Sequence, residues 1–210
     1  MTPTPPTVLV LCPSAPDAGR AALTDALATL GPVLTPTWPL GRHDDVLDAP
    51  VREVLAALDA GGGQPAVLCG IAAGALVALR AAAAAPAAVR DLLLCTGARP
   101  LGTTVRSVHR GVAGLLPVGT LQRLGGHGRA LVPILDPVRP LDYRDLAPQV
   151  RVPVLVPYGD HDRVNRRPSE LLARALPDGT AVALRGAGPG WPWREPGRLV
   201  ELVRELRERR

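Results

Sequence analysis

The chain of 210 residues contains no phenylalanine and few aromatic side chains of any kind: two Tyr and three Trp, so that aromatic residues make up 2% of the sequence. Proteins that bind single-stranded nucleic acid stack bases on aromatic side chains. Lysine is also absent, so all 24 basic residues are arginine, and together with abundant alanine and proline this is typical of a GC-rich, actinobacterial coding bias. We therefore expect no nucleic-acid partner, despite a net charge of +5.

Long hydrophobic runs are missing as well, which excludes a membrane-spanning helix of the usual length. The segment Met1–Thr7 is rich in proline and lacks the basic flank and apolar stretch of a signal peptide. We therefore expect a cytoplasmic protein with no membrane partner. The three cysteines, Cys12, Cys69 and Cys95, each end an apolar run, where free thiols behave as small buried hydrophobic groups rather than as a disulfide framework.

Strand-like and helix-like segments alternate at both ends of the chain, which predicts a parallel sheet covered by helices, the α/β class. At 210 residues the chain is long enough for one sizeable core. The predicted strands are 7–12, 33–35, 66–69, 89–95, 152–158 and 180–184, and the predicted helices are 17–30, 51–60, 73–85, 168–176 and 196–207.

Residues 98–150 interrupt this alternation, because they are rich in Gly and Pro and contain only short amphipathic pieces. We expect residues 1–97 and 151–210 to form one core domain and residues 98–150 to form a small helical lid over the carboxyl ends of the strands. The lid segment holds seven Arg and three Asp, a net of four positive charges.

The segment Ala66–Pro86 (AVLCGIAAGALVALRAAAAAP) resembles the nucleophile elbow of the α/β-hydrolase family, a strand followed by G-x-S-x-G and a helix. Gly70 and Gly74 match the two glycines. The position of the nucleophilic serine is taken by Ala72, and a methyl group cannot attack a carbonyl carbon.

Other segments resemble further parts of the same family. LVLCPS at 9–14 resembles the strand and turn that help to form the oxyanion hole, and PLGRHD at 39–44 resembles a family loop in altered form. VPVLVPYGDHD at 152–162 resembles the strand that ends in the catalytic acid, and GAGPGWPWREP at 186–196 resembles the loop that carries the catalytic histidine. The resemblance implies an α/β-hydrolase fold that lacks the family's first two antiparallel strands.

By this resemblance the acid of the triad is kept as Asp162, whereas the nucleophile position is Ala72 and the histidine position is Pro189. The triad needs a nucleophile, a base that activates it and an acid that orients the base. We therefore expect no hydrolysis by the serine mechanism. Because Pro13 has no N–H, an oxyanion donor on that side of the site must come from Ser14 or beyond.

Two groups of side chains beside these positions are candidates for binding or catalysis. His161, next to Asp162, is a possible relocated base or an exposed turn residue, and His43 is a weaker candidate. Trp191 and Trp193 follow the lost histidine position and either form a wall of the site or pack the loop onto the core. The histidines lack metal-ligand spacing, so we expect no metal and no cofactor.

The lid arginines, Arg106 and Arg110 among them, either form a solvated surface or face the elbow. In the second case they would act together with the N–H of Ala73, which opens a helix after the elbow and favours an anion. An arginine-rich lid above this N–H would suit a ligand that carries a carboxylate.

Three functions remain open. The pattern of losses and the cationic lid resemble the atypical, triad-less α/β-hydrolase-fold peptidyl-aspartate epimerases of bottromycin biosynthesis. That resemblance implies an isomerase of natural-product biosynthesis that acts on a modified ribosomal peptide with help from the substrate's own carboxylate. The second function is that of a pseudo-hydrolase that binds a small molecule or peptide. The third is a hydrolase with an unconventional nucleophile, Cys12 or Cys95.

Overall fold

The computed structural model describes residues 7–11, 17–37, 48–61, 63–95 and 146–208, and for 7–11 the backbone alone. Within these ranges six strands form one sheet in the order β2-β1-β3-β4-β5-β6, and every neighbouring pair is parallel. The strands are β1 (Thr7–Leu11), β2 (Val33–Leu34), β3 (Ala66–Ile71), β4 (Val89–Cys95), β5 (Val154–Gly159) and β6 (Gly179–Leu184). The described part of the sheet thus contains no antiparallel strand.

Helices connect these strands much as the sequence predicts. The principal helices are α1 (Asp17–Ala28), α2 (Asp48–Ala60), α3 (Ala73–Ala84), α8 (Arg166–Ala175) and α10 (Pro196–Glu208). A short helix, α9 (Trp191–Arg194), occupies what the sequence suggested was a loop, and the 3-10 turns η2 (Pro86–Ala88) and η3 (Ala147–Gln149) precede β4 and β5.

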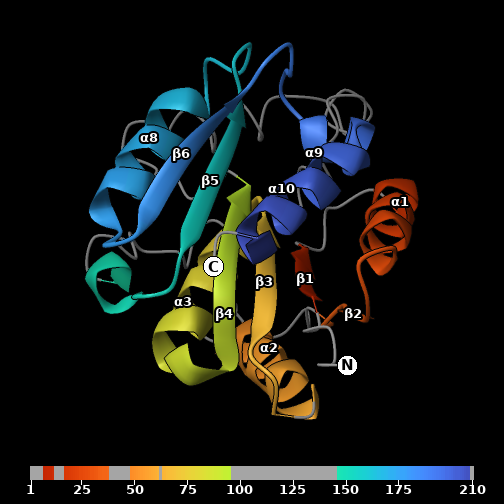
Figure 1. Ribbon diagram of the computed structural model, residues 1–210, viewed down its shortest axis with the longest axis vertical. Helices are drawn as coiled ribbons and strands as arrows, with labels where there is room; N and C mark the ends of the chain where they lie inside the picture. Colours follow the sequence, from red (N-terminus) through yellow and green to blue (C-terminus); the bar gives the residue numbers. More distant parts are fainter. Residues whose placement is uncertain (1–6, 12–16, 38–47, 62, 96–145, 209–210) are drawn as a thin grey trace, which may run out of the picture.

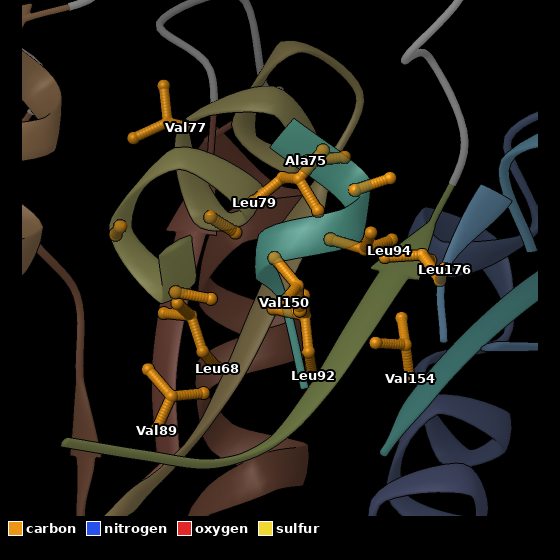
Figure 2. Packing of buried hydrophobic residues seen from close by; sticks show 14 of the residues in the cluster. Leu68, Ala75, Val77, Leu79, Val89, Leu92, Leu94, Val150, Val154 and Leu176 are labelled. Carbon is orange, nitrogen blue, oxygen red and sulfur yellow. The ribbon is translucent and has the colours of Figure 1, made fainter. Parts of the chain in front are cut away.

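Helices α2, α3 and α8 cover one face of the sheet (Figure 1). Alternate residues of the strands point to this face, as the two-residue period of a strand requires, and Leu68, Leu92 and Val154 are among them. Figure 2 shows these side chains packed beneath α3, together with Val150 from the segment before β5. Ala147 and Val150, which the sequence analysis assigned to the insertion, lie in this cluster.

Helices α1, α9 and α10 cover the opposite face (Figure 1). The intervening strand residues Cys69, Leu93 and Leu155 point to this side and are fully buried. Both faces of the central strands are therefore mostly apolar, with the buried Asp91 of β4 as an exception, which explains why these strands appear in the sequence mainly as hydrophobic runs rather than as alternating patterns.

The carboxyl ends of parallel strands lie at one edge of a sheet, and in open α/β sheets ligands bind at that edge. The turns after β3, β5 and β6 therefore meet there. Most of the predicted lid, residues 98–145, lies outside the described residues. Among the helices that the structure describes, none is both long and apolar enough to cross a membrane.

Candidate functional site

The turn between β3 and α3 has the backbone conformation of a strained elbow. Ala72 at its apex has φ 54° and ψ −125°, and it is the single non-glycine residue with positive φ in the described ranges. L-residues rarely adopt this region, and holding one there costs about 1–3 kcal/mol. The N–H of Ala72 donates to the carbonyl of Cys95 at 3.0 Å, which ties the turn to the end of β4.

Close packing between the strand and the helix imposes this bend. A Cβ added at Gly70 would lie 2.6 Å from both the Ala75 Cα and the Gly74 carbonyl oxygen, so only glycine fits there. Gly74 and Ala75 are buried in the first turn of α3. The elbow thus depends on the small residues around Ala72 and not on the side chain at the apex.

Helix α3 begins directly after the apex, at Ala73. The first N–H groups of a helix have no acceptor within the helix, and no side chain caps this one. The N–H of Ala73 is therefore a hydrogen-bond donor at the positive end of a twelve-residue helix. The sequence analysis predicted that this N–H would favour an anionic group of a ligand.

Asp162 lies in the turn after β5 and is 1% exposed. Its Oδ1 accepts the backbone N–H groups of Val164 at 3.2 Å and Asn165 at 3.1 Å, and its Oδ2 accepts the Asn165 amide at 2.6 Å. The carboxylate thus organises the entry to α8. In an intact triad a histidine would donate to this carboxylate; here Asn165 supplies a donor instead.

The loops after β5 and β6 are joined to each other. The His161 N–H donates to the Ala187 carbonyl at 3.0 Å, and the Gly186 N–H donates to the Asp160 carboxylate at 2.9 Å. A Cβ at Gly159 would lie 2.3 Å from the Ala187 carbonyl oxygen, so this close approach requires glycine. The loop that holds Asp162 is in this way fixed against the loop that leads to Pro189.

Pro189, which the sequence analysis predicted to stand at the histidine position, lies in this second loop. Its carbonyl accepts a hydrogen bond from the guanidinium of Arg194, and Gly190 follows with φ 73°. The loop therefore has its own hydrogen bonds and its own glycine-dependent turn, although it carries no imidazole at this position.

The imidazole of His161 points away from this arrangement. Its side chain is 72% exposed, and its Nε2 lies 3.8 Å from Asp160 Oδ1. Asp160 is thus the carboxylate partner of His161, while the carboxylate of Asp162 is held by Asn165 and Val164.

The two tryptophans occupy different environments. Trp191 is 2% exposed and belongs to the core layer formed by α1, α9 and α10. Trp193 is half-buried and packs against α1, where a Cβ at Gly19 would lie 3.0 Å from its ring. The structure thus places Trp191 in the core and Trp193 between α9 and α1.

The two described cysteines are buried and remain protonated. Burial raises the pKa of the Cys69 thiol to about 12, and the effect is partly offset by the charge of Arg207. Burial, and then the neighbouring Cys69, raise the pKa of Cys95 well above its usual 9.0. Because the thiolate is the reactive form of cysteine, this environment does not suit Cys95 as a nucleophile.

Several predicted residues lie outside the described residues: Ser14, Arg106, Arg110, Cys12 and His43. Within the described part of the chain, no group of His, Cys, Asp and Glu has the arrangement of a metal site. Asn165 was not singled out from the sequence, although the spacing Asp-x-x-Asn before a helix is a signal for such a turn.

The fold is similar to those of several solved structures. NosK from Streptomyces actuosus superposes with a TM-score of 0.71 at 23% identity, over 97% of this chain and 97% of that one. An esterase from Thermogutta terrifontis gives 0.72 at 21% identity (98% and 90%). A bromoperoxidase from Bacillus anthracis gives 0.77 at 12% identity (97% and 92%).

The chain has the α/β-hydrolase fold, as the sequence motifs predicted, and its neighbours of known structure are enzymes of that fold. No protein-family model and no curated protein matches the sequence.

Proposed function

We propose that the protein is a non-hydrolytic enzyme of modified-ribosomal-peptide biosynthesis that epimerises a peptidyl aspartate. The observation that carries the proposal is the strained elbow at Ala72, which keeps the helix N–H of Ala73 available although the nucleophile is absent. Donors aimed at developing negative charge are the main requirement for stabilising an enolate-type transition state.

In this reaction the α-carbon of the aspartyl residue loses its proton to the side-chain carboxylate of the same residue. The electron pair of the broken C–H bond delocalises onto the adjacent carbonyl or imine group, which accepts a hydrogen bond from Ala73. Proton return to the opposite face of the α-carbon inverts its configuration, so atoms and charge balance. The helix end contributes about 0.3–1 kcal/mol when exposed.

The base in this proposal belongs to the substrate because the described titratable groups at this edge are committed elsewhere. The carboxylate of Asp162 is buried and accepts three hydrogen bonds from its own turn. His161 is directed to solvent beside Asp160.

The experiment is exchange of the α-proton of an aspartyl thiazoline peptide in deuterium oxide, followed by mass. Wild-type protein is expected to add one deuterium at the aspartyl α-carbon. Ala72→Asp places a negative charge beside the Ala73 N–H, and Ala72→Asn is its neutral counterpart. Asp and Asn both tolerate positive φ better than most residues. The Asp variant is expected to exchange the α-proton about tenfold more slowly than the Asn variant, and this difference reports the effect of charge at the elbow.

A binding function without catalysis is the second candidate, and the absence of an uncommitted base among the described residues at this edge favours it. The same peptide distinguishes the two functions. Calorimetric binding without deuterium uptake supports the pseudo-hydrolase, and an exchange rate that is the same in both Ala72 variants contradicts the proposed role of the elbow.

A further inference from the structure

The outer side of helix α8 carries a concentration of arginine. Helix α8 packs its inner side against β5 and β6 (Figure 1), and a shallow hollow of about 390 Å³ opens on its outer side. We call this region the α8 arginine surface, and six residues line the hollow: Arg163, Arg166, Arg167, Glu170, Leu171 and Arg174.

One carboxylate on this surface is already committed. Glu170 Oε1 accepts the Arg166 Nε–H at 3.1 Å and the Tyr158 hydroxyl at 3.1 Å. These hydrogen bonds, that of Arg166 first, lower the pKa of Glu170 below its usual 4.5. Tyr158 is 7% exposed and extends from β5, so it anchors the pair to the sheet.

The remaining cations of the surface are not neutralised in this way. Arg163, Arg167 and Arg174 are exposed, and none of them forms a salt bridge with a described residue. Helix geometry spaces Arg166 and Arg174 about 12 Å apart along the axis. The positive charge is therefore distributed along the helix over more than the width of a single phosphate or carboxylate.

Two exposed apolar side chains lie in or just before the same helix. Val164 is 63% exposed and Leu171 is 45% exposed, and they are the large hydrophobic residues that the described part of the chain exposes. Single exposed apolar residues are common on protein surfaces. Here Leu171 lines the hollow together with Arg163, Arg167 and Arg174, and Val164 follows Arg163 in the chain.

We propose that the α8 arginine surface binds an extended acidic segment of a polypeptide that carries aliphatic side chains between its carboxylates. Carboxylates would pair with Arg163, Arg167 and Arg174, and an aliphatic side chain would cover Leu171. A nucleic acid fits less well, because the hollow offers no aromatic side chain on which a base could stack. This binding site goes beyond the proposed epimerase and does not depend on it.

The test uses a fluorescein-labelled peptide of repeated Glu-Glu-Leu units, with binding followed by fluorescence anisotropy in about 0.05 M salt, where surface charges are weakly screened. Arg167→Glu/Arg174→Glu is expected to raise the Kd about tenfold or more, because two attractive contacts become repulsive. The control Arg151→Glu/Arg185→Glu makes the same change in net charge at exposed arginines that do not line the hollow, and its Kd is expected to stay within about twofold of wild type.

A second comparison tests the apolar contact. Leu171→Ala is expected to weaken binding of the Glu-Glu-Leu peptide about threefold and to leave an all-Glu peptide unaffected, since one exposed aliphatic contact is lost. The proposal is overturned if both double variants weaken binding equally, if wild-type protein does not bind the peptide, or if a single-stranded DNA of equal charge binds as tightly as the peptide.

Discussion

Replacing Ala72 by glycine should stabilise the protein. Ala72 holds φ 54° and ψ −125°, which costs a non-glycine residue about 1–3 kcal/mol. Glycine removes that strain, but it loses about 0.5–1 kcal/mol through the greater freedom of the unfolded chain. It also loses part of a methyl contact with the layer around α1, worth about 0.5 kcal/mol. The net gain in the free energy of unfolding is about 1 kcal/mol.

The same substitution at an ordinary helix position provides the matched control. Ala56 is exposed within α2, where alanine to glycine costs about 1 kcal/mol. Both variants change the unfolded chain equally. The difference between their free energies of unfolding, about 2 kcal/mol, therefore isolates the backbone strain at Ala72.

Urea unfolding followed by circular dichroism gives both free energies, and tryptophan fluorescence provides an independent probe because Trp191 is buried. For a chain of this size, 1 kcal/mol corresponds to roughly 2–4 °C in Tm. Ala72→Gly should therefore melt above wild type and Ala56→Gly below it. If the two variants lose equal stability, the apex carries no strain and the reasoning about the elbow is refuted.

Four further outcomes follow from the structure. Ala72→Ser should release no burst of p-nitrophenol from p-nitrophenyl acetate, because the histidine position offers no base to the new hydroxyl; a burst equal to the protein concentration would contradict this. Asp162→Ala should lower the free energy of unfolding by about 3 kcal/mol, since buried donors lose their acceptor, and Asp162→Asn, which keeps one amide oxygen, should lose less. Ellman's reagent at pH 8 should leave the thiols of Cys69 and Cys95 unmodified in the native protein and label them in guanidinium, because burial raises the pKa of both; native labelling of either would show that the site opens. The pKa of Glu170 is lowered in the folded state, so its contribution to stability is present above its ordinary pKa of 4.5 and is lost as the pH falls through the lower folded value. Glu170→Gln should therefore flatten the decline in the urea midpoint of unfolding between about pH 5 and 3. An unchanged decline would exclude that contribution.

The sheet could be predicted from the sequence because its strands are buried on both faces. Runs such as Ala66–Ile71 and Leu92–Cys95 are continuously apolar, which is the pattern expected of strands buried between two layers of helices. Helix α9 was missed because it has four residues, one of them proline, and no period can be read from so short a segment.

The environments of individual side chains were harder to predict. The sequence left Trp191 open between a wall of the site and the core, and only the packing of α9 against α1 places it in the core. Asp162 was identified by its resemblance to a catalytic acid, but its hydrogen bonds to Asn165 depend on the geometry of the turn.

A count of charges by segment did not reveal the α8 arginine surface, for a related reason. Counting charges by segment directed attention to the lid, where arginine exceeds aspartate. The arginines of the α8 arginine surface recur at intervals that place them on one face of the helix. The neighbouring residues Ser169 and Leu172 are buried, which shows that the arginine face is the one exposed to solvent. A segment total averages the two sides of a helix and hides such a surface.

The elbow separates two properties that a serine hydrolase normally combines. The bend follows from the fit of Gly70 against Gly74 and Ala75, where an added Cβ would collide with backbone atoms. The side chain at position 72 takes no part in that fit, so the loss of serine removes nucleophilic chemistry and leaves the helix N–H of Ala73 in place. The described backbone therefore keeps a donor suited to negative charge at a position where the side chain is a methyl group. Proton transfer and anion binding both remain compatible with the described backbone; deuterium uptake set against calorimetric binding distinguishes them, and the Ala72→Asp and Ala72→Asn pair tests whether either depends on the elbow.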